Sequence, residues 1–77
     1  MTKIFDARGM KCPLPVLKAR RLLRDMQPGE VLEIQATDPG APADFVHFCE
    51  TTGHQLLDQQ TRDDVFIIRL QVAAPPA

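Results

Sequence analysis

Two spacings of apolar residues alternate along this chain, and their order limits the fold more than any other feature of the sequence. Residues 3–7 show a short apolar-polar alternation, broken where Ile4 and Phe5 are adjacent, and are interpreted as a strand with one buried face. The spacing then becomes helical, with apolar residues inside an arc of about 120° at 100° per residue. These apolar residues are Val16, Ala19, Leu22, Leu23 and Met26. A strand followed by an amphipathic helix is therefore predicted.

Proline and glycine residues mark the ends of this helix. Pro13 suits the first helical position, where its fixed φ matches the helix and its missing N–H loses no hydrogen bond. Cys12 is then expected at the N-cap. Gln27-Pro28-Gly29 is expected to stop the helix.

The rest of the chain completes an α+β pattern. The further predicted elements are a strand at 30–37, a turn at 38–40, a helix through 44–50 ending at Gly53, a weaker strand at 54–60, a polar turn at 61–64 and a strong strand at 65–72. The order β-α-β-α-β-β predicts a two-layer α/β sandwich, because two helices on one face bury one side of a small sheet. The sheet is expected to be four-stranded and mixed, since a helix joins the first two strands and a hairpin joins the last two. Residues 1–72 are read as one domain and residues 73–77 as a disordered tail.

Length and composition exclude several classes of protein. With 77 residues, 44% hydrophobic and 25% charged, the chain has the composition of an ordinary globular domain rather than of a disordered or fibrous protein. No apolar run approaches the roughly 20 residues needed to cross a bilayer. The N-terminus lacks a signal-peptide core, so we expect a cytoplasmic protein without membrane contact. Two cysteines are too few for a scaffold held by several disulfides.

The net charge of −1 hides a basic first part and an acidic remainder. Residues 1–29 carry seven basic and two acidic side chains, whereas residues 30–77 carry two basic and eight acidic ones. An uneven charge distribution of this kind also occurs in proteins whose charged faces contact only water, with no binding site. We expect four of the basic residues to form a docking surface for an acidic partner: Lys11, Arg20, Arg21 and Arg24. On an acidic protein these cations predict no stable nucleic-acid binding.

Cys12 is the candidate reactive residue. A cysteine at a helix N-terminus meets unpaired N–H groups and the positive end of the helix dipole, which favour the nucleophilic thiolate. Lys11 and Arg8 add positive charge in the same direction. In a C-x-x-C oxidoreductase site the fourth position would be a resolving cysteine, but here it is Pro15. The site therefore suits carrying sulfur as a persulfide better than exchanging electrons.

Five residues near Cys12 are predicted to shape its turn rather than to take part in bond-making: Asp6, Arg8, Gly9, Pro13 and Pro15. The prolines stiffen the segment, and Gly9 allows a sharp turn. Because Pro13 and Pro15 have no N–H groups, only two amides of the first helical turn can face the sulfur, which weakens the effect of the helix dipole on the thiol. Asp6 and Arg8 could instead pair with each other. A purely structural role for Cys12, as a small apolar residue, is the alternative interpretation.

The remaining candidate groups point to no metal or cofactor. Cys49 lies on the apolar side of the second predicted helix, which favours a buried, inert thiol. The two histidines and two cysteines include no pair at zinc spacing. The absence of serine excludes Ser-based triads. A Cys-His pair would require His47 or His54 to approach Cys12, and the sequence leaves this open.

Several motifs together resemble one known family. They are Phe5-Asp6-Ala7-Arg8-Gly9-Met10-Lys11-Cys12-Pro13-Leu14-Pro15, Met26-Gln27-Pro28-Gly29-Glu30, Asp38-Pro39, Phe48-Cys49 and Gly53-His54. The chain resembles the TusA (SirA/YedF) family of small sulfur carriers to about Val72. The resemblance implies a β-α-β-α-β-β sandwich whose Cys12 accepts sulfane sulfur from the persulfide of a cysteine desulfurase and passes it to an acceptor protein, formally a sulfurtransferase activity.

The resemblance leaves the final destination of the sulfur open. In the best-known branch of the family the sulfur reaches the 2-thio group of the wobble uridine of certain tRNAs. Other branches serve molybdenum-cofactor enzymes or sulfur metabolism. The alternative function, from a different class, is a non-catalytic regulatory module that docks acidic partners through the basic helix. We expect a monomer, and replacing Cys12 by serine separates the two functions.

Overall fold

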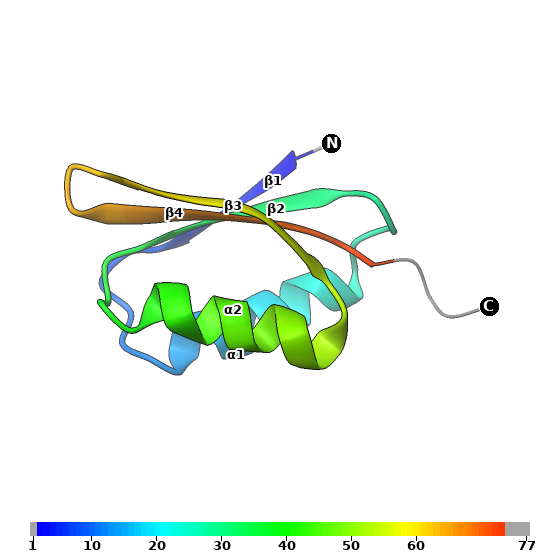
Figure 1. Cartoon of the computed structure of the whole chain (residues 1–77), viewed down its shortest axis with the longest axis horizontal. Helices are drawn as coiled ribbons and strands as arrows, with labels where there is room; N and C mark the ends of the chain where they lie inside the picture. The colour runs from blue at the N-terminus through cyan, green and yellow to red at the C-terminus, as the bar shows by residue number, and fades with distance from the viewer. Residues whose placement is uncertain (1, 74–77) are drawn as a thin grey trace.

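A four-stranded sheet with two helices on one face makes up residues 2–73, the part of the chain that this computed structural model describes (Figure 1). In chain order the elements are β1 (Thr2–Ala7), α1 (Leu14–Arg24), β2 (Val31–Ala36), α2 (Ala41–Thr52), β3 (Gln55–Arg62) and β4 (Val65–Gln71). The predicted α+β sandwich of β-α-β-α-β-β order is confirmed.

The strand order of the sheet is β1-β2-β4-β3. β1 and β2 are parallel, whereas β4 is antiparallel to both of its neighbours, so the sheet is mixed as predicted. Because β1 and β2 run in the same direction, the loops that leave their carboxyl ends lie at the same edge of the sheet. One of these loops leads into α1 and the other into α2, and Figure 1 shows both at the same end of the molecule.

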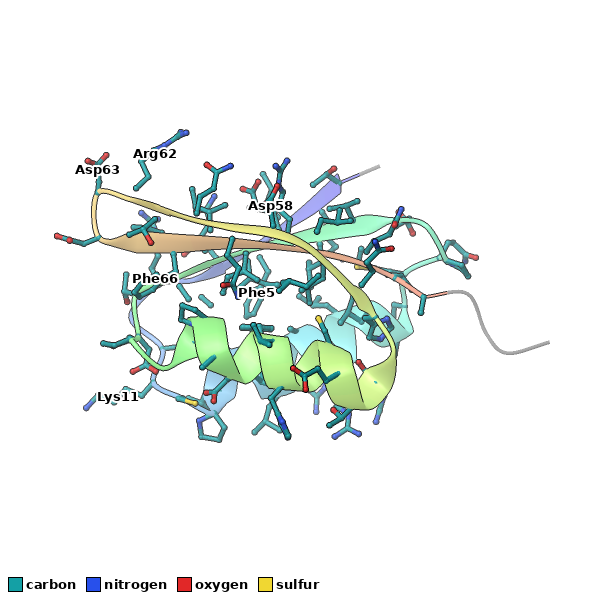
Figure 2. The ribbon with its side chains drawn as sticks, in the orientation of Figure 1. Phe5, Lys11, Asp58, Arg62, Asp63 and Phe66 are labelled. Carbon is teal, nitrogen blue, oxygen red and sulfur yellow. The ribbon has the colours of Figure 1, made fainter. Side chains whose placement is uncertain are left out.

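The core lies between the sheet and the helices, where the alternating and helical patterns meet. Its fully buried large side chains are Leu32 and Ile34 of β2, Ile68 and Leu70 of β4, Phe45 of α2 and Pro15 of α1. Phe5 and Phe66 pack against this core while keeping some exposure, and Figure 2 shows them on the helix side of the sheet. The opposite face is largely polar, with Asp58 of β3 hydrogen-bonded to Arg69 of β4.

The second helix begins earlier than predicted, at Ala41 rather than near Asp44. Pro42 lies in its first turn, where a missing N–H loses no helical hydrogen bond. The Ala41 N–H donates to the Asp38 carbonyl at 3.0 Å, which starts the turn. The helix ends as predicted at Gly53, which adopts a left-handed φ of 86°.

The last two strands form the predicted hairpin, with β3 longer than expected. β3 continues to Arg62, and the turn narrows to Asp63 and Asp64, whose φ values are 50° and 65°. Positive φ at both central residues fits the twist of a two-residue hairpin loop. Neither helix within residues 2–73 has the length and hydrophobicity required to cross a membrane. Apart from Ala73, the tail predicted at 73–77 lies outside the described residues.

Candidate functional site

Cys12 lies on the loop between β1 and α1, at the edge of the sheet where both strand-to-helix loops meet, and its side chain is exposed. Figure 2 labels its neighbour Lys11 at this end of the molecule. A pocket of about 290 Å³ separates the start of α1 from α2. Its lining includes Cys12, Pro13 and Val16 on one side and Asp44, His47 and Phe48 on the other. The candidate thiol therefore opens onto a small, largely apolar pocket between the two helices.

The helix start differs from the prediction that placed Cys12 at the N-cap. α1 begins at Leu14, its N-cap is Pro13, and Pro15 rather than Pro13 lies inside the first turn. The Leu14 N–H donates to the Lys11 carbonyl at 2.9 Å, so this amide does not face the sulfur. The Cys12–Pro13 peptide bond is cis. Cys12 thus precedes the cap, and the predicted stabilisation of its thiolate by first-turn amides was wrong.

Asp6 and Arg8 pair with each other, the arrangement that the sequence left open. Arg8 Nε donates to Asp6 Oδ1 at 2.9 Å and Arg8 Nη2 donates to Asp6 Oδ2 at 3.0 Å. These side-chain hydrogen bonds, followed by one from the Arg8 backbone, lower the pKa of Asp6. Both side chains remain more than half exposed. Arg8 is therefore held by its own carboxylate partner, not by the thiol.

Gly9 connects the Cys12 loop to the neighbouring strand. Its φ of +81° is one that glycine adopts readily, and its N–H donates to Thr37 Oγ1 at 3.0 Å. Thr37 directly follows β2. Pro15 is fully buried in the core below the loop, whereas Pro13 is exposed. The loop that carries Cys12 is thus attached to the end of β2 on one side and to the core on the other.

Asp44, in the first turn of α2, faces Cys12 across the pocket, and the thiol donates a hydrogen bond to Asp44 Oδ2. This bond, followed by burial and by the negative charges of Asp44 and Asp38, raises the pKa of Cys12 to about 11. The charged groups that shift this pKa are carboxylates, whereas Arg8 is paired with Asp6. The prediction that nearby positive charge would favour the thiolate was wrong, because carboxylates of α2 and of its preceding loop act on the sulfur instead.

Sequence reasoning missed Asp44 because 32 residues separate it from Cys12. One signal could have found it. Parallel β1 and β2 each lead directly into a helix, so the starts of α1 and α2 must meet at one edge of the sheet. A polar residue in the first turn of the second helix is then a candidate neighbour of Cys12.

The four predicted docking residues, Lys11, Arg20, Arg21 and Arg24, are all exposed. The two ion pairs found within residues 2–73, Asp6 with Arg8 and Asp58 with Arg69, include none of them. Three of the four lie on α1, and Lys11 lies beside the thiol. These basic side chains are thus exposed, and three of them lie on α1, the helix that follows the Cys12 loop.

A second hollow lies along α1. It measures about 410 Å³, and its lining combines Phe5 of β1 with Leu17, Lys18, Arg21 and Leu22 of α1. Leu17 is 52% exposed. Sequence reasoning assigned no role to Lys18 or Leu17. Leu17 is an apolar residue outside the apolar arc of the first helix, and this position could have indicated an exposed apolar surface.

The two histidines occupy different surroundings. His47 lines the same pocket as Cys12. His54 instead stacks on Phe48, with ring centroids 5.9 Å apart, and its Nδ1 accepts the Ala73 N–H at 3.1 Å. Burial lowers the pKa of His54. His47 is therefore the histidine that shares the thiol pocket.

Cys49 is a buried free thiol, 8% exposed, in agreement with the predicted apolar position. Burial raises its pKa, so it is a weak nucleophile. No cluster of three or more His, Cys, Asp or Glu residues suited to a metal ion occurs in the described part of the chain. The chemistry available at the site is that of one exposed thiol.

Comparisons with known proteins agree on one family. The sequence profile described as "Sulfurtransferase TusA" matches residues 3–72. A putative sulfur carrier protein of Neisseria meningitidis serogroup A is 50% identical over 70 residues, which cover 91% of this chain and 95% of that protein. The sulfur carrier protein TusA of Allochromatium vinosum is 43% identical over 62 residues, 80% of this chain and 82% of that protein. A crystal structure of a SirA-like protein from Desulfitobacterium hafniense has the same fold, with a TM-score of 0.83 and 22% identity over 96% of this chain and 100% of that one. The chain therefore belongs to the TusA family.

Proposed function

We propose that this protein is a sulfur carrier that accepts sulfane sulfur as a persulfide on Cys12 from a cysteine desulfurase and relays it to an acceptor protein. The observation that carries this proposal is the single exposed thiol, Cys12, in the C-P-x-P segment of a TusA-family chain. The other thiol, Cys49, is buried, so a persulfide on Cys12 has no accessible neighbour within the described chain to expel its sulfur.

The transfer conserves the oxidation state of the moving sulfur. Cys12 Sγ attacks the outer sulfur of the donor persulfide, which forms a new S–S bond and breaks the S–S bond of the donor. The donor cysteine leaves as a thiolate and takes up, through solvent, the proton that Cys12 loses. Cys12 is oxidised to the persulfide while the donor persulfide is reduced to a thiol, so no other oxidant is required.

The basic residues Lys11, Arg20, Arg21 and Arg24 are proposed to dock the donor and the acceptor. All four are exposed, and their positive charge would attract an acidic partner surface and raise the rate of encounter. Three of them lie on the helix that follows Cys12 in the chain, so docking there brings a partner close to the thiol.

The first destination proposed for the sulfur is the 2-thio group of the wobble uridine of tRNA, reached through a downstream acceptor protein. Acceptors for molybdenum-cofactor enzymes and for sulfur metabolism are the other two. Loaded protein carrying radioactive sulfur, offered separately to an acceptor of each branch, should label one of them and leave the other two unlabelled.

Intact-protein mass spectrometry tests the first step. Wild type, Cys12→Ser and Cys49→Ala are each incubated with a cysteine desulfurase and cysteine, without reductant. Wild type and Cys49→Ala should gain the mass of one sulfur atom, removable by dithiothreitol, and Cys12→Ser should gain none. No adduct on wild type with several desulfurases or thiosulfate-derived donors would contradict the carrier function and favour a docking module that acts through the basic helix.

A further inference from the structure

We propose that Asp44 is a positioning residue that holds Cys12 as a neutral, hydrogen-bonded thiol in the empty protein and so restrains its reactivity. This inference rests on the proposed carrier function for its biological meaning. It concerns the state of the free thiol, which can be measured without any sulfur donor.

The geometry around Asp44 leaves its carboxylate free to act on the thiol. The Asp44 backbone is fixed in the first turn of α2, where its N–H donates to the Gly40 carbonyl at 3.1 Å. Its side chain is half-buried and accepts the hydrogen bond from Cys12. Neither ion pair of the described chain involves Asp44, so no cation neutralises it. The carboxylate therefore faces the sulfur without a basic side chain paired to it in the described residues.

The charged and titratable groups around Cys12 come from three segments. α2 contributes Asp44 and His47, and the loop before it contributes Asp38. The segment of the thiol itself contributes Lys11. Asp38 acts by charge alone, because its own Oδ2 accepts the Gly40 N–H at 3.2 Å. The pKa of Cys12 rises to about 11, first through the hydrogen bond to Asp44, and the negative charges of Asp44 and Asp38 act in the same direction.

The restraint has a direct chemical consequence. The thiolate is the form that attacks persulfides, disulfides and alkylating reagents. A thiol that stays protonated at neutral pH reacts slowly with small electrophiles and oxidants, even though it is exposed. The empty carrier is therefore protected from such reagents in solution.

A thiolate titration tests the role of Asp44 by ultraviolet absorbance. Wild type, Asp44→Asn and Asp44→Glu are compared with Glu50→Gln, which removes an exposed carboxylate from the same helix. Cys12→Ser supplies the signal of Cys49 for subtraction. Near pH 9.5, where a group of pKa about 11 is mostly protonated and one of 9.0 mostly ionised, wild type, Asp44→Glu and Glu50→Gln should be mainly thiol. Asp44→Asn should contain clearly more thiolate than wild type, because burial and the charge of Asp38 remain but the hydrogen bond to the carboxylate is lost. Circular dichroism should report the same fold.

Two results would overturn the inference. One is a wild-type Cys12 that is already mainly thiolate near pH 9.5, which needs no variant to be observed. The other is an Asp44→Asn titration that matches wild type. Sulfur loading of the same proteins is scored separately. If Asp44→Asn shifts the titration but neither protein takes up sulfur, the carrier function fails and the role of Asp44 stands. If wild type and Asp44→Asn both take up sulfur but have the same titration curve, the carrier function stands and the role of Asp44 fails.

Discussion

Reversing two charges on α1 should slow sulfur transfer without unfolding the protein. Arg20 and Arg24 are both exposed, and neither belongs to an ion pair of the described residues. The double variant Arg20→Glu/Arg24→Glu lowers the net charge of residues 1–29 from +5 to +1. No buried contact is lost, but Arg24 lies in the last turn of α1, where a negative charge is unfavourable by about 0.3–1 kcal/mol. The midpoint of urea unfolding should therefore fall only slightly.

The size of the effect follows from how the charge acts. Clefts and patches of one sign raise association rates by about 10- to 1,000-fold. Loss of four of the five net positive charges should therefore reduce the second-order rate constant of transfer from the desulfurase by about tenfold or more. The rate within the bound complex should change little, since Cys12 and its pocket are untouched.

Salt separates docking from chemistry in this experiment. The screening length falls from about 10 Å at 0.1 M salt to about 3 Å at 1 M. The ratio of wild-type to variant rate constants, measured by quenched mass spectrometry of the persulfide, should therefore shrink as salt increases.

Arg62→Glu supplies the control, because it makes one reversal of the same size at the hairpin tip, on a different part of the molecule (Figure 2). It should leave transfer nearly unchanged, whereas the single variant Arg24→Glu should already slow it. Equal transfer rates for wild type and the double variant, at low and at moderate salt, would refute the role of α1 in docking.

Three further predictions address reactivity and stability. Asp44→Asn should alkylate with iodoacetamide faster than wild type near pH 7.5, by up to about tenfold. A pKa that fell all the way from about 11 to 9.0 would give about 100-fold more thiolate, of which about tenfold is offset by weaker intrinsic nucleophilicity, and burial and Asp38 retain part of the shift. Asp38→Asn should change the rate in the same direction but less, and a slower Asp44→Asn would contradict the assignment. Phe45→Ala, at a fully buried position, should lower the free energy of unfolding by about 3–5 kcal/mol in urea denaturation, and a loss below about 1 kcal/mol would argue against Phe45 as a centre of the core. Burial lowers the pKa of His54, so the unfolded chain binds more protons below about pH 6.5, and the free energy of unfolding should rise with pH through this range. His54→Asn should show a weaker rise in urea denaturation at several pH values. The same pH dependence for His54→Asn and wild type would contradict this role of His54.

The sequence predicted those parts of the fold in which a single local pattern decides burial. Leu32, Ile34 and Ala36 alternate along β2, and all three are buried. Phe45 and Phe48 share one side of α2 and face the sheet, as the helical spacing indicates. Such patterns predict structure because the apolar side of each element has to leave water, whichever neighbour covers it.

The prolines show where local reasoning about boundaries fails. Pro13 and Pro15 both fit the beginning of a helix, since neither needs an N–H partner there. The structure places Pro15 inside the first turn and buries it, whereas Pro13 caps the helix. The choice between them depends on which of the two rings is buried, and burial depends on tertiary packing that a local rule does not contain.

The charged surroundings of the Cys12 thiol were also predicted wrongly, and the cause is again a tertiary contact. Local reasoning considered only the cations of the segment that carries Cys12, which favour the thiolate. The groups that act on the sulfur, Asp44 and Asp38, belong to the second helix and its loop. They reach Cys12 only because two parallel strands bring the starts of α1 and α2 together. The direction of the pKa shift of Cys12 therefore depends on the topology of the sheet. The predicted order of the elements already implied that topology.

Sulfur loading itself changes the contact between Cys12 and Asp44, and this connects the two proposals. In the empty protein the hydrogen of Sγ forms the hydrogen bond to Asp44 Oδ2. In a persulfide, Sγ is bonded to carbon and to the outer sulfur and carries no hydrogen, so this bond is lost. If the proposed persulfide forms and its outer sulfur is ionised, the same carboxylate would repel that sulfur. Under both proposals, the side chain that restrains the empty thiol would therefore favour exposure of the loaded sulfur, and Asp44 would interact differently with the two states.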